Sequence, residues 1–211
     1  MKRALLVVDV QNDFMPEGSL PVPEGDQVVP LIHQLMDRFE IVVATQDWHP
    51  ADHGSFASNH EGRQPGETID LEGLEQILWP DHCVQGTLGA QFHPEVRSEK
   101  FTKVFRKGTD RSIDSYSGFH DNGHRRSTGL AEWLRQSGVD TVFVCGLAAD
   151  VCVRFTVLDA IREGFTTYLV CDATRGVNLR PGDVDQALEQ MRDAGAELIE
   201  SDEVGEARQG G

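Results

Sequence analysis

The sequence has few cysteines, few basic residues and no long apolar run. Its four cysteines, at positions 83, 145, 152 and 171, are scattered over 211 residues without a CxxC pair, which excludes a disulfide framework and predicts free thiols. Only 19 basic residues face 35 acidic ones, and the formal charge of -16 repels nucleic acid and anionic membrane surfaces. No segment approaches the roughly 18 consecutive apolar residues of a membrane-spanning helix. We therefore expect a cytoplasmic protein that binds neither nucleic acid nor membrane.

Six apolar runs divide the chain at intervals that suit a parallel sheet. Most are continuous, as strands covered on both faces require, and they cover residues 4–10, 41–45, 103–107, 141–148, 166–171 and 196–200. The first run is a strand rather than a signal peptide, because Asp9 interrupts it and no small-residue cleavage site follows. Apolar residues at helical spacing occupy 26–39, 127–137, 149–163 and 181–194. This alternation predicts an α/β fold, a doubly wound, mostly parallel six-stranded sheet with helices on both faces.

The length of the chain suits a single domain spanning residues 1–211. One segment, at about 50–100, has little regular pattern and is too long for a simple connection, so we expect it to carry function. The acidic, glycine-ended tail at about 202–211 is expected to be flexible. Cys145 and Cys171 lie inside apolar runs, where a cysteine is typically a buried small hydrophobe.

Polar and reactive side chains stand where the predicted strands end. Asp9 ends the first strand, Asp47 and His49 end the second, Lys107 ends the third, and Cys152 follows the fourth across the turn GLAAD. In a doubly wound sheet, ligands bind beyond the carboxyl ends of the strands. We therefore expect these side chains to contribute to one site.

The stretch TQDWHPADHGSF, residues 45–56, is a candidate metal site. Asp47 and His49 are two residues apart, so at an extended strand end they point to the same side. His82, in WPDHCVQGT, is the best candidate for a third ligand, and one carboxylate with two imidazoles suits Zn2+, or Fe2+ or Mn2+. His53 is either a fourth ligand or a hydrogen-bonding neighbour. The alternative is that both motifs are polar turns at the surface.

Cys152 is a candidate nucleophile. It falls in the first turn of a helix expected to begin at about Asp150, where free backbone N–H groups and the helix dipole lower the pKa of a thiol. The same N–H groups, with that of Ala148 or Ala149, would receive an oxyanion. The alternative is that Cys152 packs into the core, as Cys145 is expected to do.

A carboxylate and an amine complete the candidate chemistry. Asp9 would be costly to bury without a partner or a task. Arg106 and Lys107 cannot both point outward from an alternating strand, so one of them is expected to face the site. Cys83, beside His82, is an alternative nucleophile or ligand.

Six blocks of sequence, taken in order, resemble one known family. The chain is similar to the nicotinamidases, within the isochorismatase-like cysteine hydrolases, through LLVVDVQNDFMPEGSLPVPEGD, TQDWHPADHGSFA, WPDHCVQGTLGAQFHP, VFRKGTD, DSYSGFHDN and GLAADVCVRFTVLDA. The resemblance implies hydrolysis of nicotinamide to nicotinate and ammonia through a cysteine thioester, in pyridine nucleotide salvage, and deamidation of pyrazinamide.

The resemblance also implies a role for each candidate residue. The implied catalytic residues are the nucleophile Cys152, the proton-transfer carboxylate Asp9 and the orienting cation Lys107. The implied metal ligands are Asp47, His49 and His82, holding a divalent ion, usually zinc, that binds the ring nitrogen of nicotinamide. The implied ring pocket is lined by Phe14, Trp79 and Tyr116, and a cis peptide between Leu147 and Ala148 aims the Ala148 N–H into the oxyanion hole.

Departures from the family pattern are small. Ala149 and Val151 stand where the family often has threonine and tyrosine, and little effect on the chemistry is expected, because backbone N–H groups perform it. Relatives with the same triad hydrolyse other amides, ureas or a vinyl ether, so another small amide or ester remains the alternative substrate. The sequence leaves the formation of a homo-oligomer open.

Overall fold

The computed structural model describes residues 2–205, and a six-stranded sheet lies at its centre. The strand order is β5-β2-β1-β6-β7-β8, and every neighbouring pair is parallel. The strands are β1 (Lys2–Val8), β2 (Ile41–Asp47), β5 (Lys103–Lys107), β6 (Val139–Leu147), β7 (Thr166–Arg175) and β8 (Glu197–Ile199). The predicted six-stranded sheet is confirmed.

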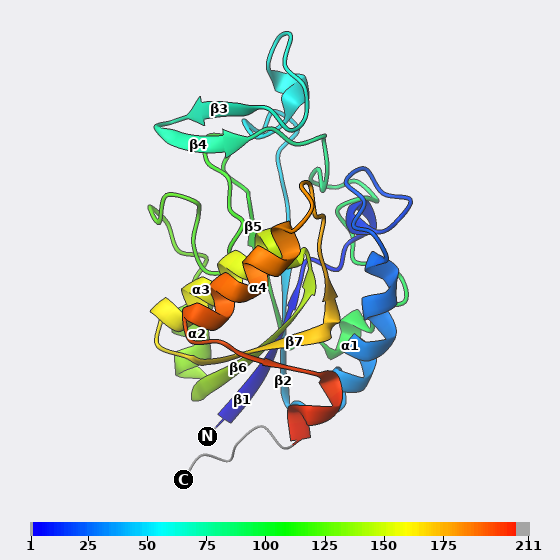
Figure 1. Ribbon diagram of the computed structural model, residues 1–211, viewed down its shortest axis with the longest axis vertical. Coiled ribbons are helices and arrows are strands. Elements are labelled where there is room, and N and C mark those ends of the chain that lie inside the picture. Colours follow the sequence, from blue (N-terminus) through cyan, green and yellow to red (C-terminus); the bar gives the residue numbers. More distant parts are fainter. Residues whose placement is uncertain (1, 206–211) are drawn as a thin grey trace.

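Helices cover both faces of this sheet, as the sequence predicted (Figure 1). The helix α1 (Val28–Met36) covers one face, and α2 (Leu130–Gln136), α3 (Arg154–Arg162) and α4 (Asp183–Asp193) cover the other. Successive side chains of a strand point to opposite faces. Leu5 of β1 therefore packs with Ile32 of α1, whereas Leu6 packs with Leu134 of α2 and Val157 of α3.

The strand order places a topological switch point beside β1. This central strand pairs with β2 on one side and with β6 on the other, so the chain reverses its direction of winding there. A crevice forms at such a point beyond the carboxyl ends of the strands. These ends point toward the upper part of Figure 1, where the long segment between β2 and β5 lies.

That segment contains a hairpin that the sequence pattern did not predict. The strands β3 (Thr68–Leu71) and β4 (Leu74–Ile77) pair antiparallel and stand beyond the sheet. The rest of the segment is irregular but tied down by bridges between His49 and Val84 and between Phe56 and Trp79. Short 3-10 turns occupy Asn12–Phe14, Gly25–Gln27, Ala57–Asn59, Ser98–Lys100 and Ser201–Gly205.

Three local expectations need correction. The helix expected over 149–163 begins with a π-helical turn, Ala149–Val153, before α3. The tail is not irregular from 202 onward, because Ser201–Gly205 is helical, Val204 is buried and its carbonyl accepts a hydrogen bond from Arg3; residues 206–211 lie outside the described part of the chain. Cys171 is only partly buried.

The helices between residues 2 and 205 are all short. None of those described is long and apolar enough to cross a membrane.

Candidate active site and metal centre

Two strand ends and the π-helical turn bring a carboxylate, an amine and a thiol together. Asp9 directly follows β1, Lys107 closes β5, and Cys152 lies in the turn before α3. Lys107 Nζ is 2.9 Å from Asp9 Oδ2 and 3.4 Å from Cys152 Sγ. All three residues are buried, so the structure assembles the three side chains that their strand-end positions predicted to meet.

The hydrogen bonds of Lys107 leave one oxygen of Asp9 available. The ammonium donates to Asp47 Oδ1 at 2.7 Å, to the carbonyl of Ser115 at 3.0 Å and to Cys152 Sγ, which uses its three protons. Asp9 Oδ1 accepts a 2.6 Å hydrogen bond from Thr45. Asp9 Oδ2 forms the 2.9 Å ion pair with Lys107 but has no partner with hydrogen-bond geometry among the described residues, so it is the oxygen better placed to receive a proton.

Burial and charge shift the pKa values of this group in different directions. Burial raises the pKa of both Asp9 and Cys152, and the Lys107 ammonium offsets only part of each rise. Burial alone would lower the pKa of Lys107, but Asp47 and Asp9 hold it well above its usual value. The thiol pKa is thus raised, not lowered as a position at a helix terminus predicted. In this structure the thiol needs a base to accept its proton as it attacks.

A second group of side chains meets at the end of β2. Asp47 Oδ2 lies 3.3 Å from His49 Nε2 and 3.6 Å from His82 Nε2. The opposite ring nitrogens contact backbone carbonyls, His49 Nδ1 that of Gly108 at 2.9 Å and His82 Nδ1 that of Pro80 at 2.7 Å. Each carbonyl fixes a proton on Nδ1 and turns the lone pair of Nε2 toward Asp47.

This geometry fits a divalent ion. Ligand atoms about 2.1 Å from a tetrahedrally bound ion lie about 3.4 Å from one another. The separations of 3.3 and 3.6 Å around Asp47 Oδ2 match that value, and the three ligand atoms form a compact group.

Backbone contacts bring the distant third member of this group into place. The N–H of His49 donates to the carbonyl of Cys83, and the N–H of Gln85 donates to the carbonyl of His49. This pairing sets His82 beside the end of β2. Gly108 is also required, because a Cβ there would lie 2.3 Å from His49 Cε1, and its φ of +64° favours glycine.

The two uncertain neighbours of the metal group take different positions. His53 is buried with its ring 4.3 Å from that of His49, and its Nδ1 lies 2.7 Å from Ser55 Oγ. It falls in a separate metal-capable group with His49 and Asp114 rather than with Asp47 and His82. The thiol of Cys83 is buried in the core, outside every metal-capable group found among residues 2–205.

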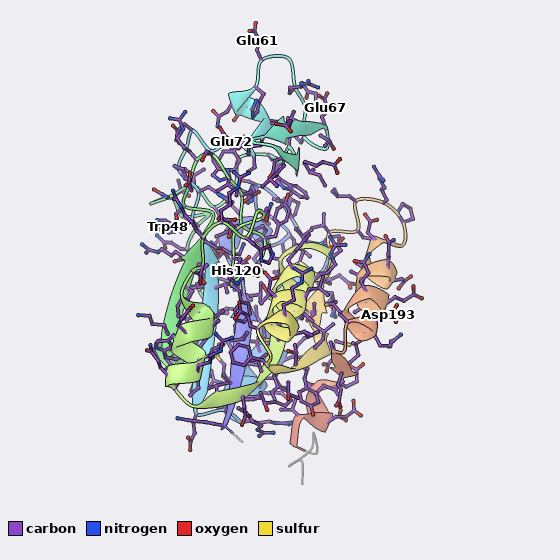
Figure 2. The ribbon with its side chains drawn as sticks, turned by 90° about the vertical axis from the view of Figure 1, so that its left-hand side faces the viewer. Trp48, Glu61, Glu67, Glu72, His120 and Asp193 are labelled. Atoms are coloured by element: carbon purple, nitrogen blue, oxygen red, sulfur yellow. The ribbon has the colours of Figure 1, made fainter. Side chains whose placement is uncertain are left out.

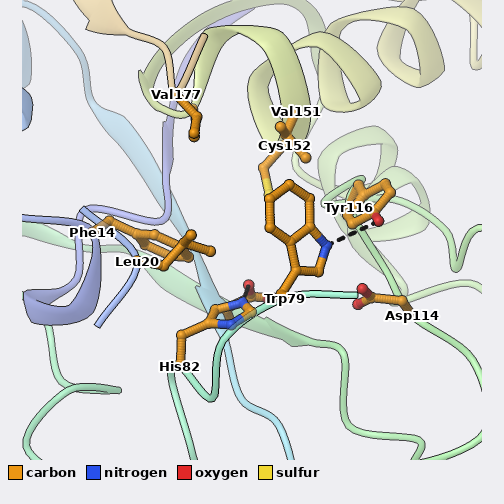
Figure 3. A pocket seen from close by; sticks show the side chains of 11 residues that line it. Phe14, Leu20, Trp79, His82, Asp114, Tyr116, Val151, Cys152 and Val177 are labelled. Atoms are coloured by element: carbon orange, nitrogen blue, oxygen red, sulfur yellow. Dashed lines mark hydrogen bonds and ion pairs between the residues drawn. The ribbon is translucent and has the colours of Figure 1, made fainter. Parts of the chain in front are cut away.

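An apolar pocket opens over Cys152 and the metal group (Figure 3). The residues named from the sequence all line it: Phe14, Trp79, Tyr116 and Ala148. The indole of Trp79 lies between Cys152 and His82 and donates a 3.1 Å hydrogen bond to the Tyr116 hydroxyl. The cis peptide between Leu147 and Ala148 is present.

Sequence reasoning missed part of the pocket wall. Leu20, Asp114 and Val177 line it and lie in loops without a distinguishing pattern. Val151 was expected to matter little, yet its side chain also lines the pocket, so its size bears on the fit of a ligand. The position of Val151, one residue before the nucleophile, was the only available signal.

Comparison with known proteins agrees with this site. A family model described as the isochorismatase domain matches residues 3–203. The nicotinamidase of Escherichia coli (strain K12) is 50% identical over 200 residues, 93% of each chain. A solved Acinetobacter baumanii nicotinamidase/pyrazinamidase superposes with a TM-score of 0.93 at 47% identity, covering 96% of this chain and 98% of that one. The Pyrococcus horikoshii pyrazinamidase, solved in complex with zinc, gives 0.78 at 39% identity, covering 95% and 99%.

The family model spans nearly the whole chain. The matches to these relatives also cover nearly the full length of both chains, and the solved relative has the same fold. This chain belongs to the isochorismatase family.

Proposed function

We propose that the protein is an amidohydrolase that converts nicotinamide to nicotinate and ammonia, and that deamidates pyrazinamide in the same way. The observation that carries this proposal is the convergence of Asp9, Lys107 and Cys152 with a metal-capable group across one apolar pocket. A flat ring suits the aromatic walls, and a carboxamide on that ring would reach Cys152. The curated relatives act on the same amides by name.

The first half of the reaction acylates Cys152. Asp9 Oδ2 accepts the thiol proton while Sγ attacks the carbonyl carbon, and Lys107 holds both groups in position. The backbone N–H groups of Ala148 and Cys152 receive the oxyanion. Asp9 then passes its proton to the amide nitrogen, the C–N bond breaks, ammonia leaves and a thioester remains.

The second half releases the acid. Asp9 accepts a proton from water as the water oxygen attacks the thioester carbon. The C–S bond breaks, the acid leaves, and the proton returns from Asp9 to the Cys152 thiolate. One carboxylate thus serves alternately as base and acid, and its raised pKa makes it a better base than an exposed carboxylate.

The residues Asp47, His49 and His82 would hold a divalent metal, and Zn2+ is the ion we propose. One carboxylate with two imidazoles is a donor set that zinc accepts with positions left over. When bound, the ion supplies a Lewis acid that holds the ring nitrogen of the substrate and so orients its amide. His53 remains a neighbour that supports His49 in this proposal.

We further propose that a single domain carries the activity, that it acts in the cytoplasm and that its product enters pyridine nucleotide salvage. The family match over residues 3–203 supports the first point.

The direct test is ammonia release from nicotinamide by the purified protein, before and after chelator treatment and after zinc is returned. We expect release that stops with the chelator and resumes with zinc. Metal-loaded, folded protein that releases no ammonia from nicotinamide but does from another small amide would establish the alternative substrate.

A further inference from the structure

The hairpin β3–β4 is largely exposed but buries one polar side chain. Glu72 in its turn is exposed, and Glu67, which precedes β3 at the opposite end, is partly exposed (Figure 2). Gln76 of β4 is the exception, with only 2% of its surface exposed. A buried amide is costly unless it is hydrogen-bonded, so its partners indicate why it is there.

The amide nitrogen of Gln76 faces three acceptors. Its two protons serve the carbonyl of Ile77 at 2.7 Å, the hydroxyl of Tyr116 at 2.9 Å and, at the longest distance, Asp114 Oδ2 at 3.2 Å, so one proton is shared between two acceptors. A carbonyl and a carboxylate only accept hydrogen bonds, so the side-chain nitrogen rather than the oxygen must face them.

Two of these partners belong to the wall of the pocket. Tyr116 and Asp114 line the pocket and lie 40 and 38 residues from Gln76 in sequence. The Tyr116 hydroxyl also accepts the hydrogen bond from Trp79, and the two rings meet edge-on at 6.4 Å (Figure 3). A bond to Ile77 alone would be a local hairpin contact, whereas these contacts connect the hairpin with the pocket.

We propose that Gln76 is a positioning residue that fixes the width of the ring pocket and so restricts the substrate to single-ring carboxamides. This inference rests on the proposed function. Without the Gln76 donor, Asp114 Oδ2 loses a hydrogen bond inside the protein, and the Tyr116 hydroxyl keeps only the bond from Trp79. Both side chains then gain freedom to move, and the aromatic wall loosens.

The variant Gln76→Met tests this proposal, because methionine has a similar length and no donor. Glu75→Ala is the matched control, since Glu75 is the exposed neighbour on the same strand. The first measurement is hydrogen exchange of the three tryptophan indole N–H groups, with Trp48 and Trp133 as internal references. We expect exchange of the Trp79 indole N–H to accelerate about tenfold in Gln76→Met and to stay unchanged in Glu75→Ala. This is the size of effect that the loss of one hydrogen bond implies.

The second measurement is steady-state kinetics with nicotinamide and with a fused two-ring analogue, quinoline-3-carboxamide. We expect KM for nicotinamide to rise about tenfold with little change in kcat, and the preference for nicotinamide over the analogue to fall by a similar factor. A merely structural role would lower the fraction of active enzyme and leave KM and the preference unchanged. Tyr116→Phe should change KM and the preference in the same way. The double variant with Gln76→Met should then differ little from Tyr116→Phe alone.

The outcomes separate the two proposals. Wild-type protein that releases no ammonia from nicotinamide overturns the proposed function, and the indole exchange then decides by itself whether Gln76 holds the wall. Active wild-type enzyme with unchanged Trp79 exchange, or with unchanged KM and preference in Gln76→Met, overturns the role of Gln76.

Discussion

The candidate site joins two regions that are built differently. Asp9, Lys107 and Cys152 are held by ends of the parallel sheet and by the turn that follows β6, so the ladder of the sheet sets their positions. His49, Trp79 and His82 come from the irregular segment between β2 and β5, which is held by isolated bridges and loop contacts. The first region is fixed by regular secondary structure and the second by individual contacts.

This difference has a consequence for tolerance to substitution. Replacing a side chain at a strand end removes a chemical group but leaves the ladder that placed it. In the irregular segment, one misplaced contact moves a ligand or a pocket wall. We therefore expect loss of chemistry with the fold retained in the first region, except where removing a charge leaves buried ions unpaired. In the second region we expect loss of binding.

The largest effect is expected for Cys152→Ala. It removes the nucleophile, so kcat should fall by at least about 10⁴-fold, while the denaturation midpoint stays close to that of the wild type. Ammonia release and thermal unfolding measure the two quantities.

The control for this variant is Cys83→Ala, a change to the other cysteine considered as a nucleophile. The Cys83 thiol is buried in the core and does not line the pocket, so its loss should leave kcat within a few-fold of the wild type. Full activity of Cys152→Ala together with an inactive Cys83→Ala would reverse the assignment of the nucleophile.

The second largest effect is expected for Lys107→Met, which leaves the buried carboxylates of Asp9 and Asp47 without their common cation. Breaking a buried ion pair on one side typically destabilises by about 3–5 kcal/mol. Denaturant unfolding should show a loss of that order. Lys103→Met on the same strand is the control, because Lys103 is exposed and should change stability little. Equal stability of the two variants would contradict this account of the strand-end region.

The fold and the strand-end region could largely be predicted from the sequence. Continuous apolar runs separated by helical spacing specify a parallel sheet, and the residue that ends each run then falls at the carboxyl edge. Asp9, Lys107 and Cys152 become candidates from their positions at or just after these ends, although the pattern leaves Arg106 open beside Lys107 and core packing open for Cys152. The thiol pKa could not be predicted in the same way, because local helix geometry is visible in the sequence while the burial of Cys152 is not.

The irregular region could be predicted only in part: residue types made His49 and His82 candidate ligands, whereas the role of Trp79 came from the resemblance to known sequences. No periodicity places His82 beside Asp47, since the contact depends on one bridge between His49 and Val84. The hairpin and Gln76 went unrecognised because TIDLEGLEQI alternates weakly and gives no sign that one glutamine is buried. Contacts between loops distant in sequence leave no local pattern for such reasoning to use.

A smaller effect is expected for Gly108→Ala, which tests the irregular region. The added Cβ would lie 2.3 Å from His49 Cε1, so the ring must shift, and metal affinity should fall about 10- to 100-fold. Competition with a chelator measures that affinity. Gly129→Ala is the matched control, because Gly129 also has a positive φ, of +86°, but no atom within 4 Å of an added Cβ. Gly129→Ala should lower the stability, because alanine is strained at a positive φ, but it should keep the metal affinity of the wild type.

The smallest effect is expected at the surface, for Glu163→Gln. Glu163 accepts hydrogen bonds from His120 at 2.7 Å and from Arg135 at 2.6 Å, and these bonds lower its pKa. Because the pKa is lower in the folded state than in the unfolded state, the ionised carboxylate stabilises the fold at pH values above the ordinary pKa of a carboxyl group. That stabilisation is lost as the pH falls through the folded-state pKa. The variant should therefore lose less than about 1 kcal/mol at pH 7, and the difference from the wild type should shrink below about pH 4. Glu189→Gln, at an exposed position of α4, should show no such pH dependence in urea unfolding. A difference for Glu163→Gln that persists at low pH would instead indicate loss of packing, which would make this surface pair resemble the buried ion pairs of Lys107.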